Sequence, residues 1–312
     1  MLGMVFAAGL GTRLRPLTER LPKPMVPLFD RPLASYSLER LAVAGVTHCA
    51  LNTHYLADRV PDVMQGHVPD GIEAHFVHEP ELLGTGGGLK NAVMQVAERV
   101  GLAADEPIVV MNGDIFFWPD LERAIATHQR LGAIATVVLR DDPRAAQLGS
   151  LELDAEGRVR RLLGKPEDID AGPLTTHMFT GVHVLSARAI DALPDTGCVI
   201  REGYRHWVDD PSEVVGGIVD DSPWRDLGTP EEYHRVHMDL LRGDLRWPGR
   251  PPDDEDAEIG EGAELKDVVL GRGAQVSAGV RLERVVVWPG THVVEDASDC
   301  ILAPHARVEA IS

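Results

Sequence analysis

The sequence predicts an α/β protein with a doubly wound, mostly parallel sheet, followed by a short solenoid of stacked strands. The sheet is predicted because short apolar runs alternate with helical patterns, and several of these runs end in polar, glycine-containing loops. The solenoid is predicted by an internal repeat near the C-terminus. We therefore expect an α/β domain over residues 1–247, a linker over 248–256 and a solenoid over 257–312.

Composition limits the classes of partner. The chain has 312 residues and a formal net charge of −19, from 49 acidic and 30 basic residues. Binding of nucleic acid through the general surface needs clustered Lys and Arg, so we expect no such partner. No apolar run approaches the roughly 20 residues that span a bilayer, and the N-terminus does not resemble a signal peptide. We expect a cytoplasmic protein without membrane contact, whose three cysteines are buried free thiols.

The first element is a buried strand over Met4–Ala8, which runs into the loop Gly9–Arg13. Two glycines let this loop turn sharply and expose its N–H groups, a geometry that suits an anion. Arg13 and Lys23 add positive charge nearby. The short glycine pair matches neither common phosphate signature, because position 14 is Leu and no Gly-Lys-Ser/Thr follows. From the pair alone, a plain strand-to-loop turn is as good an interpretation as a phosphate loop.

The rest of the N-terminal half alternates helices and strands. Ile108–Met111 is a buried strand that ends in Asn112, Gly113 and Asp114. Ligands of open α/β sheets bind beyond the carboxyl ends of the strands, so Asp114 and the Gly9 loop can face one crevice. The other expected elements are a helix over 32–44, a strand over 46–52, a helix over 55–64, a strand over 73–77, a loop over 79–88 and a helix over 89–100.

The second half is predicted to hold a helix and strand within 121–139 and a hairpin of 150–153 with 159–163. Thr229 is the expected N-cap of a helix over Pro230–Arg242, with Pro at its first turn. Further expected elements are a strand over 179–185, a short helix from 186, a helical stretch over 198–207 and strands over 214–219 and 224–226.

The C-terminal repeat has a period of 17 residues, so that Ile259 aligns with Val276. A third copy, Val293–Val308, fits if two residues are dropped after Ser298. Aliphatic residues recur about every six positions within each copy, which favours short strands with tight turns over a helix. Three coils are few, so we expect the catalytic domain or a partner subunit to cap them.

The stretch Gly9–Thr18 with Pro22-Lys23-Pro24 closely resembles the signature of the sugar-1-phosphate nucleotidyltransferases. The segments Leu83–Gly88 and Trp224–Pro230 resemble two further blocks of that family, and the repeat resembles the left-handed β-helix that many members carry. The resemblance implies a Rossmann-like nucleotidyltransferase domain plus a short C-terminal left-handed β-helix. It also implies transfer of a nucleotidyl group from an NTP to a sugar 1-phosphate, with release of pyrophosphate.

The resemblance implies roles for individual residues. Asp114 and Asp226 would hold Mg²⁺, which takes carboxylates and phosphate oxygens as ligands, although a plain turn aspartate is the alternative for each. Lys23, which could otherwise be a solvated loop lysine, would contact phosphate. The catalytic set is Arg13, Lys23 and Asp114; the nucleotide set is Ala8, Gly9, Gly11, Thr12, Glu79, Gly84, Thr85 and Asn112; the sugar set is Gly149, Lys165, Thr180 and Gly181.

Several alternatives stay open. Gly164 stands where the family usually has glutamate before Lys165-Pro166, which puts one sugar contact in doubt. GTP with a mannose- or heptose-type sugar phosphate is slightly favoured over UTP with N-acetylmuramate 1-phosphate or a glucose-type sugar. A non-catalytic subunit that binds nucleotide sugars is the alternative from another class, and a homo-oligomer is expected. The thirteen histidines take no metal-ligand spacing, so we interpret them as core or surface residues.

Overall fold

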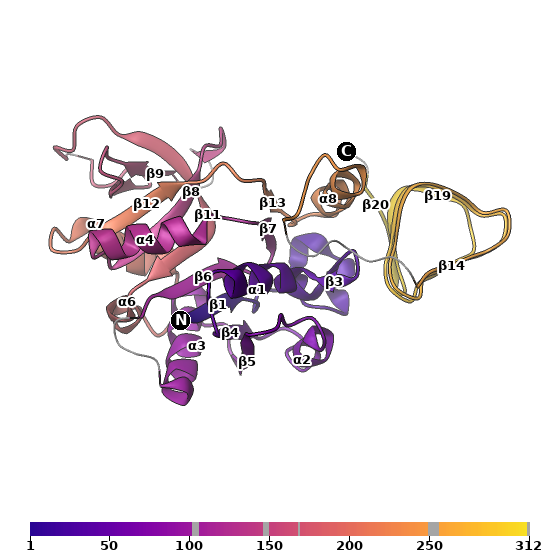
Figure 1. The fold of residues 1–312 in the computed structure, drawn as a ribbon, viewed down its shortest axis with the longest axis horizontal. Helices are drawn as coiled ribbons and strands as arrows, with labels where there is room; N and C mark the ends of the chain where they lie inside the picture. Colours follow the sequence, from indigo (N-terminus) through magenta and orange to yellow (C-terminus); the bar gives the residue numbers. More distant parts are fainter. Residues whose placement is uncertain (102–105, 146–149, 168, 249–255, 311–312) are drawn as a thin grey trace.

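The computed structural model describes residues 1–101, 106–145, 150–167, 169–248 and 256–310. An α/β body holds the N-terminal elements, and the C-terminal strands form coils at one end of it (Figure 1). Helix α8 (Pro230–Arg242) lies between the body and the coils, and it packs against the first long coil strand, β15 (Glu264–Leu270). Thr229 caps α8 by accepting a hydrogen bond from the Glu232 N–H, which confirms the predicted N-cap.

The body is built on a mixed sheet that has nine strands among the described residues. Its first half is parallel: β1 pairs with β4 and β6, and β4 pairs with the edge strand β5. The second half departs from the doubly wound expectation, because β11 runs antiparallel to β6, β8 and β9. The strands are β1 (Leu2–Phe6), β4 (His48–Thr53), β5 (Glu73–His78), β6 (Ile108–Asn112), β8 (Ala135–Arg140), β9 (Ser150–Leu153), β10 (Val159–Leu162), β11 (Thr175–Leu185) and β12 (Val215–Val219).

Register fixes which side chains meet at the carboxyl edge of the parallel half. Phe6, the last residue of β1, is paired with Asn52 on β4 and with Asn112 on β6. The loops that leave these three strands therefore start side by side, as the parallel arrangement predicts. Strand β1 ends two residues earlier than expected, so Ala8 belongs to the loop.

Helices cover the sheet, and two of them differ from the prediction. Helix α3 (Gly84–Val100) begins five residues before the expected Leu89, so the glycine-rich segment is its first turn rather than a loop. Helix α2 (Arg59–Met64) begins later than expected. The remaining elements include α1 (Leu33–Val43), α4 (Leu121–Leu131), α6 (Ala187–Ala192), a π-helix over Val199–Tyr204, α7 (Arg205–Asp209) and a small antiparallel pair of β7 (Ile115–Phe117) with β13 (Trp224–Asp226).

The C-terminal strands stack in parallel from coil to coil, in line with the repeat. Glu258 pairs with Gln275 and Leu265 pairs with Leu282, both with an offset of 17 residues. The long strands are β15, β17 (Arg281–Val287) and β19 (Ala297–Ala303), closed by antiparallel β20 (Ala306–Glu309); the short strands are β14 (Glu258–Ile259), β16 (Gln275–Val276) and β18 (His292–Val293). The coils overlie one another in Figure 1. Their handedness stays a prediction.

The two-residue shortening of the third coil lies elsewhere than the sequence indicated. Val276 still pairs with Val293, but Leu282 pairs with Ala297, so the shortening falls between Val293 and Ala297 and not after Ser298. The Asp296 carboxylate accepts a hydrogen bond of 2.8 Å from the Arg281 N–H at this turn. In the preceding coil the equivalent Glu264 N–H donates to a main-chain carbonyl, so a side chain replaces the missing backbone acceptor.

The coils and the body share a hydrophobic core. Val269, Val286 and Ile301 from three successive coils pack with Tyr233 of α8 and Leu17 of the N-terminal segment. Burial of apolar side chains from both parts stabilises their contact. The proposed linker lies mostly outside the described residues, and the domain division at 247 and 257 stays a prediction.

The three cysteines are free, and Cys198 is half-buried whereas Cys49 and Cys300 are buried. Among the described residues, no helix combines the length and the apolar character that crossing a membrane requires.

Candidate active site

A cavity of about 400 Å³ lies at the carboxyl edge of β1, β4 and β6. It brings together the whole predicted catalytic set and the whole predicted nucleotide set. Five further residues line the cavity, and the sequence had predicted no role in the site for them: Phe6, Pro24, Asn52, Leu82 and Gly228. The predicted residues that line it are Ala8, Gly9, Gly11, Thr12, Arg13, Lys23, Glu79, Gly84, Thr85, Asn112 and Asp114.

Lys23 is the charged centre of this cavity. Its side chain is only 7% exposed, because Lys23 stands between Pro22 and Pro24 at the start of the buried 3₁₀ helix Lys23–Met25. The ammonium group donates to Asp114 Oδ2 at 2.8 Å and to Asp226 Oδ1 at 3.2 Å. A buried ammonium is costly unless it is paired, and here two carboxylates pair with it.

Arg13 approaches the same cluster from the glycine loop. Its guanidinium lies 3.5 Å from Asp226 Oδ2, while its side chain stays 67% exposed. A guanidinium on this rim offers several N–H donors to an anion in the cavity. Arg13 is therefore free to turn from the carboxylate toward a phosphate group.

The glycine loop is fixed by its own contacts. Gly11 has a left-handed φ of 61°, and its carbonyl accepts a 2.8 Å hydrogen bond from the Thr18 hydroxyl. The Ala7 N–H at the start of the loop donates to Asn52 Oδ1 at 2.9 Å. The loop is thus pre-organised at both ends, with its residues from Ala8 to Thr12 on the cavity wall.

Asn52 is a site residue that the sequence reasoning missed. Its amide donates to Glu79 Oε1 at 2.7 Å, and the other carboxylate oxygen of Glu79 accepts from the Leu83 N–H. Glu79 is 1% exposed, so the pair is a buried polar link between β4 and the start of α3. The signal that could have found Asn52 is its place at the carboxyl end of a strand next to β1.

Because the glycines of α3 carry no side chain, they leave room for the Asn52–Glu79 link and for the backbone around Asp195, which also lies close to the helix. A Cβ on Gly88 would lie 2.6 Å from Glu79 Oε1, and one on Gly87 would lie 2.2 Å from the Asp195 carbonyl oxygen. The Thr85 hydroxyl also accepts a 3.0 Å hydrogen bond from the Val199 N–H. The glycine run thus lets other groups approach a helix closely, and the predicted loop over 79–88 is wrong for Gly84–Gly88.

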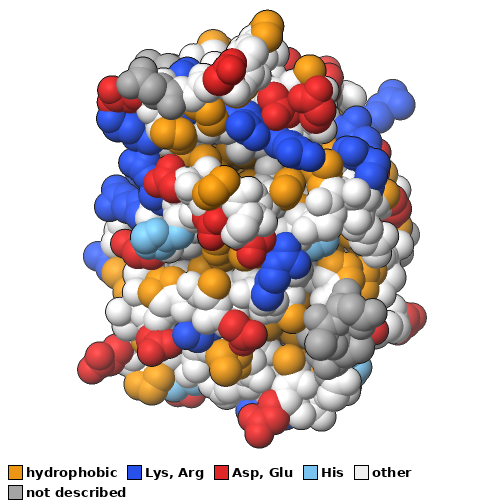
Figure 2. Space-filling view, turned by 90° about the vertical axis from the view of Figure 1, so that its left-hand side faces the viewer, with side chains coloured by type: hydrophobic (Ala, Val, Ile, Leu, Met, Phe, Trp, Pro, Cys, Tyr) orange, Lys and Arg blue, Asp and Glu red, His pale blue; other side chains and the backbone are white. Residues whose placement is uncertain are grey.

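Of the four residues predicted to bind sugar, the three that the structure describes, Lys165, Thr180 and Gly181, are not among the residues that line this cavity. Gly149 lies outside the described residues. Lys165 lines a different cavity, with Arg158 and Trp207. Thr180 is fully buried and its hydroxyl donates to the Val138 carbonyl, while Gly181 lies against the Asn112 amide. Figure 2 shows the molecule from the β9 and β12 end, where basic side chains lie among acidic ones.

The donor set at Asp114 and Asp226 fits a hard divalent cation. Both carboxylates reach one point, now taken by the Lys23 ammonium, and each is about one-third exposed. Oxygen ligands from one or two carboxylates, completed by phosphate oxygens, are what Mg²⁺ prefers in phosphoryl-transfer sites. The residues present therefore suit Mg²⁺.

Comparison with known proteins identifies the family. The nucleotidyl transferase family model matches residues 2–243. Mannose-1-phosphate guanylyltransferase of Mycobacterium tuberculosis is 35% identical over 305 residues, which span 93% of this chain and 80% of the relative. UTP–glucose-1-phosphate uridylyltransferase of Synechocystis is 29% identical over 79% of this chain and 65% of the relative.

Solved structures agree with this relationship. The crystal structure of HddC from Yersinia pseudotuberculosis matches with a TM-score of 0.59 and 26% identity, covering 77% of this chain and 99% of that one. A second structure of the same protein is complexed with GMP-PN. The cavity, its cationic side chains and these matches all agree. The chain belongs to the nucleotidyl transferase family, as a member of its sugar-1-phosphate nucleotidyltransferases.

Proposed function

We propose that this protein transfers a guanylyl group from GTP to a mannose-type sugar 1-phosphate and depends on Mg²⁺. The observation that carries the reaction type is the buried Lys23, held between Asp114 and Asp226 at the edge of the cavity. GTP and a mannose-type acceptor are supported by the guanylyltransferase from Mycobacterium tuberculosis, which covers nearly the whole chain.

The reaction needs no nucleophilic side chain. A phosphate oxygen of the sugar 1-phosphate attacks the α-phosphorus of GTP, and the bond from that phosphorus to the bridging oxygen of the β-phosphate breaks. The electron pair leaves with pyrophosphate, and no proton has to move. Two polyanions must therefore be held in line, which makes positioning and charge compensation the tasks of the protein.

The residues of the cavity divide these tasks. The backbone of the loop from Gly9 to Thr12 lies where it can donate N–H groups to the triphosphate. Arg13 and Lys23 place positive charge beside the reacting phosphates, and Asp114 with Asp226 would hold Mg²⁺, which when bound offsets negative charge on the phosphates. Glu79 and Asn52 act as positioning residues, since they tie the loop to the start of α3.

Uridylyl transfer is the second candidate function, supported by the uridylyltransferase relative from Synechocystis. A non-catalytic nucleotide-sugar-binding role is the third, although this chain keeps Arg13, Lys23, Asp114 and Asp226 together at its cavity.

The test is pyrophosphate release with four NTPs and a panel of mannose, heptose, glucose and N-acetylmuramate 1-phosphates, with and without Mg²⁺. We expect GTP with the mannose-type acceptor to exceed every UTP pair in kcat/KM by tenfold or more, about 1.4 kcal/mol. A UTP pair that exceeds it would replace the proposal with uridylyl transfer. No turnover, together with tight binding of a nucleotide sugar, would favour the non-catalytic role.

A further inference from the structure

A second group of potential ligands lies at the opposite, amino-terminal edge of the sheet. His48 is the first residue of β4, and Glu73 is the first residue of β5. The parallel register places His48 beside Glu73, and His75 beside Ala50. Because residues two apart on a strand share a face, Glu73 and His75 point to the same side of the sheet, where His48 also lies.

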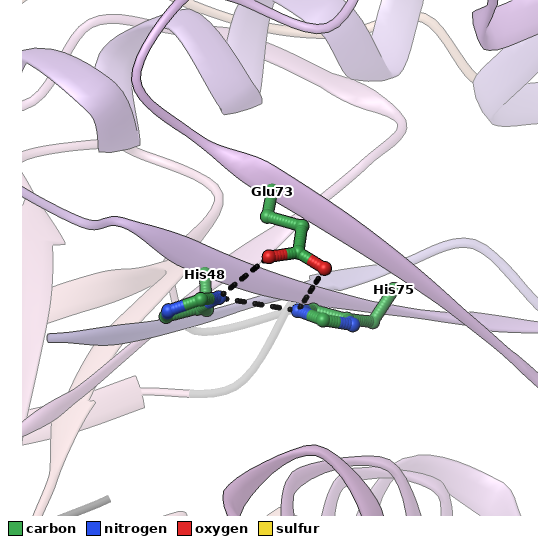
Figure 3. A group of neighbouring side chains, drawn as sticks. All are labelled: His48, Glu73 and His75. Atoms are coloured by element: carbon green, nitrogen blue, oxygen red, sulfur yellow. Dashed lines mark hydrogen bonds and ion pairs between the residues drawn. The ribbon is translucent and has the colours of Figure 1, made fainter. Parts of the chain in front are cut away.

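The three side chains converge on one point (Figure 3). His48 Nδ1 lies 3.3 Å from His75 Nε2 and 3.5 Å from Glu73 Oε2. His75 Nε2 lies 3.8 Å from Glu73 Oε1. Two ring nitrogens this close cannot both carry a proton directed at the other, so at least one lone pair points into the group.

The distance between the two ring nitrogens matches that between neighbouring ligands of a tetrahedral metal ion. Zn²⁺ binds imidazole nitrogen at about 2.0–2.1 Å, so two ligands of a tetrahedral ion lie about 3.3–3.4 Å apart. The nitrogen pair already has this spacing, and a small rotation of the Glu73 side chain, which is 67% exposed, would bring its oxygen in. The side chain of His75, by contrast, is only 11% exposed.

We propose that His48, Glu73 and His75 form a binding site for a divalent transition metal of the Zn²⁺ type. Two imidazoles and one carboxylate suit Zn²⁺ and its neighbours rather than Mg²⁺, which prefers oxygen ligands. The site is partly open, since the side chain of His48 is 33% exposed, so water or an outside ligand can complete the coordination. This proposal is independent of the one made for the active site.

Bound metal would join the edge strand β5 to β4. Strand β5 ends the sheet and pairs only with β4 in the described sheet order. At the far ends of this pair lie Asn52 and, one residue after β5, Glu79, which form the buried link at the active-site cavity. A metal that binds only the folded pair stabilises it by RT ln(1 + [M]/Kd), which rises with the logarithm of the metal concentration.

The experiment uses the full chain, treated with chelator and then titrated with ZnCl₂ by calorimetry, and with CoCl₂ followed by visible absorption. We expect one equivalent to bind, an intense tetrahedral Co²⁺ band and a rise in melting temperature on addition of Zn²⁺. His48→Gln and His75→Gln should each weaken binding at least tenfold, and Glu73→Gln should weaken it less. His78→Gln is the matched control, because His78 is an exposed histidine at the other end of the same strand.

Circular dichroism of each metal-free variant shows whether it is folded. The Glu73→Gln and His48→Gln variants change side chains that are 67% and 33% exposed, which the fold should tolerate. Equal binding by the wild type and the folded His48→Gln variant would overturn the proposal. So would an absence of binding by the wild type at 100-fold excess of Zn²⁺, in which case the group is a hydrogen-bonded cluster only.

Discussion

The two edges of the parallel half-sheet carry polar clusters that are built differently. At the carboxyl edge, Lys23, Asp114 and Asp226 come from segments up to 203 positions apart: a 3₁₀ helix, a turn and the end of β13. At the amino edge, His48 and His75 are 27 positions apart and meet through strand register alone. Segments outside the main sheet can thus bring distant groups together around a large ligand, whereas strand register alone brings together a compact set of side chains for a small ion.

The largest effect is expected from Asp114→Asn at the carboxyl edge. The amide keeps the shape of the side chain but loses the charge that pairs with Lys23 and would hold Mg²⁺. We expect kcat for nucleotidyl transfer to fall about 10²-fold or more, as measured by pyrophosphate release. Glu73→Gln makes the same chemical change at the amino edge and should leave kcat within about twofold. Unchanged turnover in Asp114→Asn would remove the role assigned to this carboxylate.

A smaller effect is expected from Gly88→Ala, which places a methyl group 2.6 Å from Glu79 Oε1 and 2.9 Å from the Asn52 amide. Alanine would otherwise favour the helix by about 1 kcal/mol, so the sign of the stability change is informative. We expect the clash to prevail, with a lower melting temperature and KM for the NTP raised about tenfold.

Met94→Ala is the control for Gly88→Ala, because Met94 is exposed on the same helix, α3. It should change neither melting temperature nor KM noticeably. A Gly88→Ala variant that is more stable than the wild type, with KM unchanged, would show that the Asn52–Glu79 link can shift without loss.

The smallest effect is expected from replacing His237, and it concerns the pH dependence of stability. This histidine is enclosed in the core, unlike the histidines at the amino edge. His237 Nε2 accepts from the Phe29 N–H while Nδ1 donates to the Tyr233 carbonyl, so the ring is neutral. Burial lowers the pKa of His237 to about 3 from its ordinary value of 6.5. The unfolded chain therefore binds one more proton between these values, and stability is lost as the pH falls below about 6.5.

This histidine alone contributes a loss of about 1.4 kcal/mol per pH unit in that range. Urea unfolding from pH 7.5 to pH 5.5 measures the total slope. In His237→Gln, whose amide can donate and accept at the same two positions, the slope should shrink by about half a proton on average over this pH range, and by nearly one proton at pH 5.5. An unchanged slope would mean that the ring is already protonated in the folded protein.

Much of the α/β body could be predicted from the sequence. The alternation of apolar runs gave the parallel strands, and the rule that ligands bind at carboxyl strand ends placed Asp114 and the Gly9 loop at one crevice, as observed. The antiparallel β11 was not foreseen as such, because an apolar run carries no information about strand direction. The start of α3 was predicted too late because glycine normally disfavours helix. Here glycine is favoured because the segment around Asp195 packs closely against the helix and leaves no room for a side chain.

The sequence by itself determined the family, the repeat and most of the residues that line the candidate active-site cavity, since each depends on residue types at fixed spacing. Only the tertiary structure decided that Lys23 is buried between two carboxylates, that Asn52 supports Glu79, and that His48 and His75 meet. Such contacts depend on register, burial and close approach between segments far apart in the chain. Those properties arise when strands pair and helices pack, and no local pattern of residues specifies them.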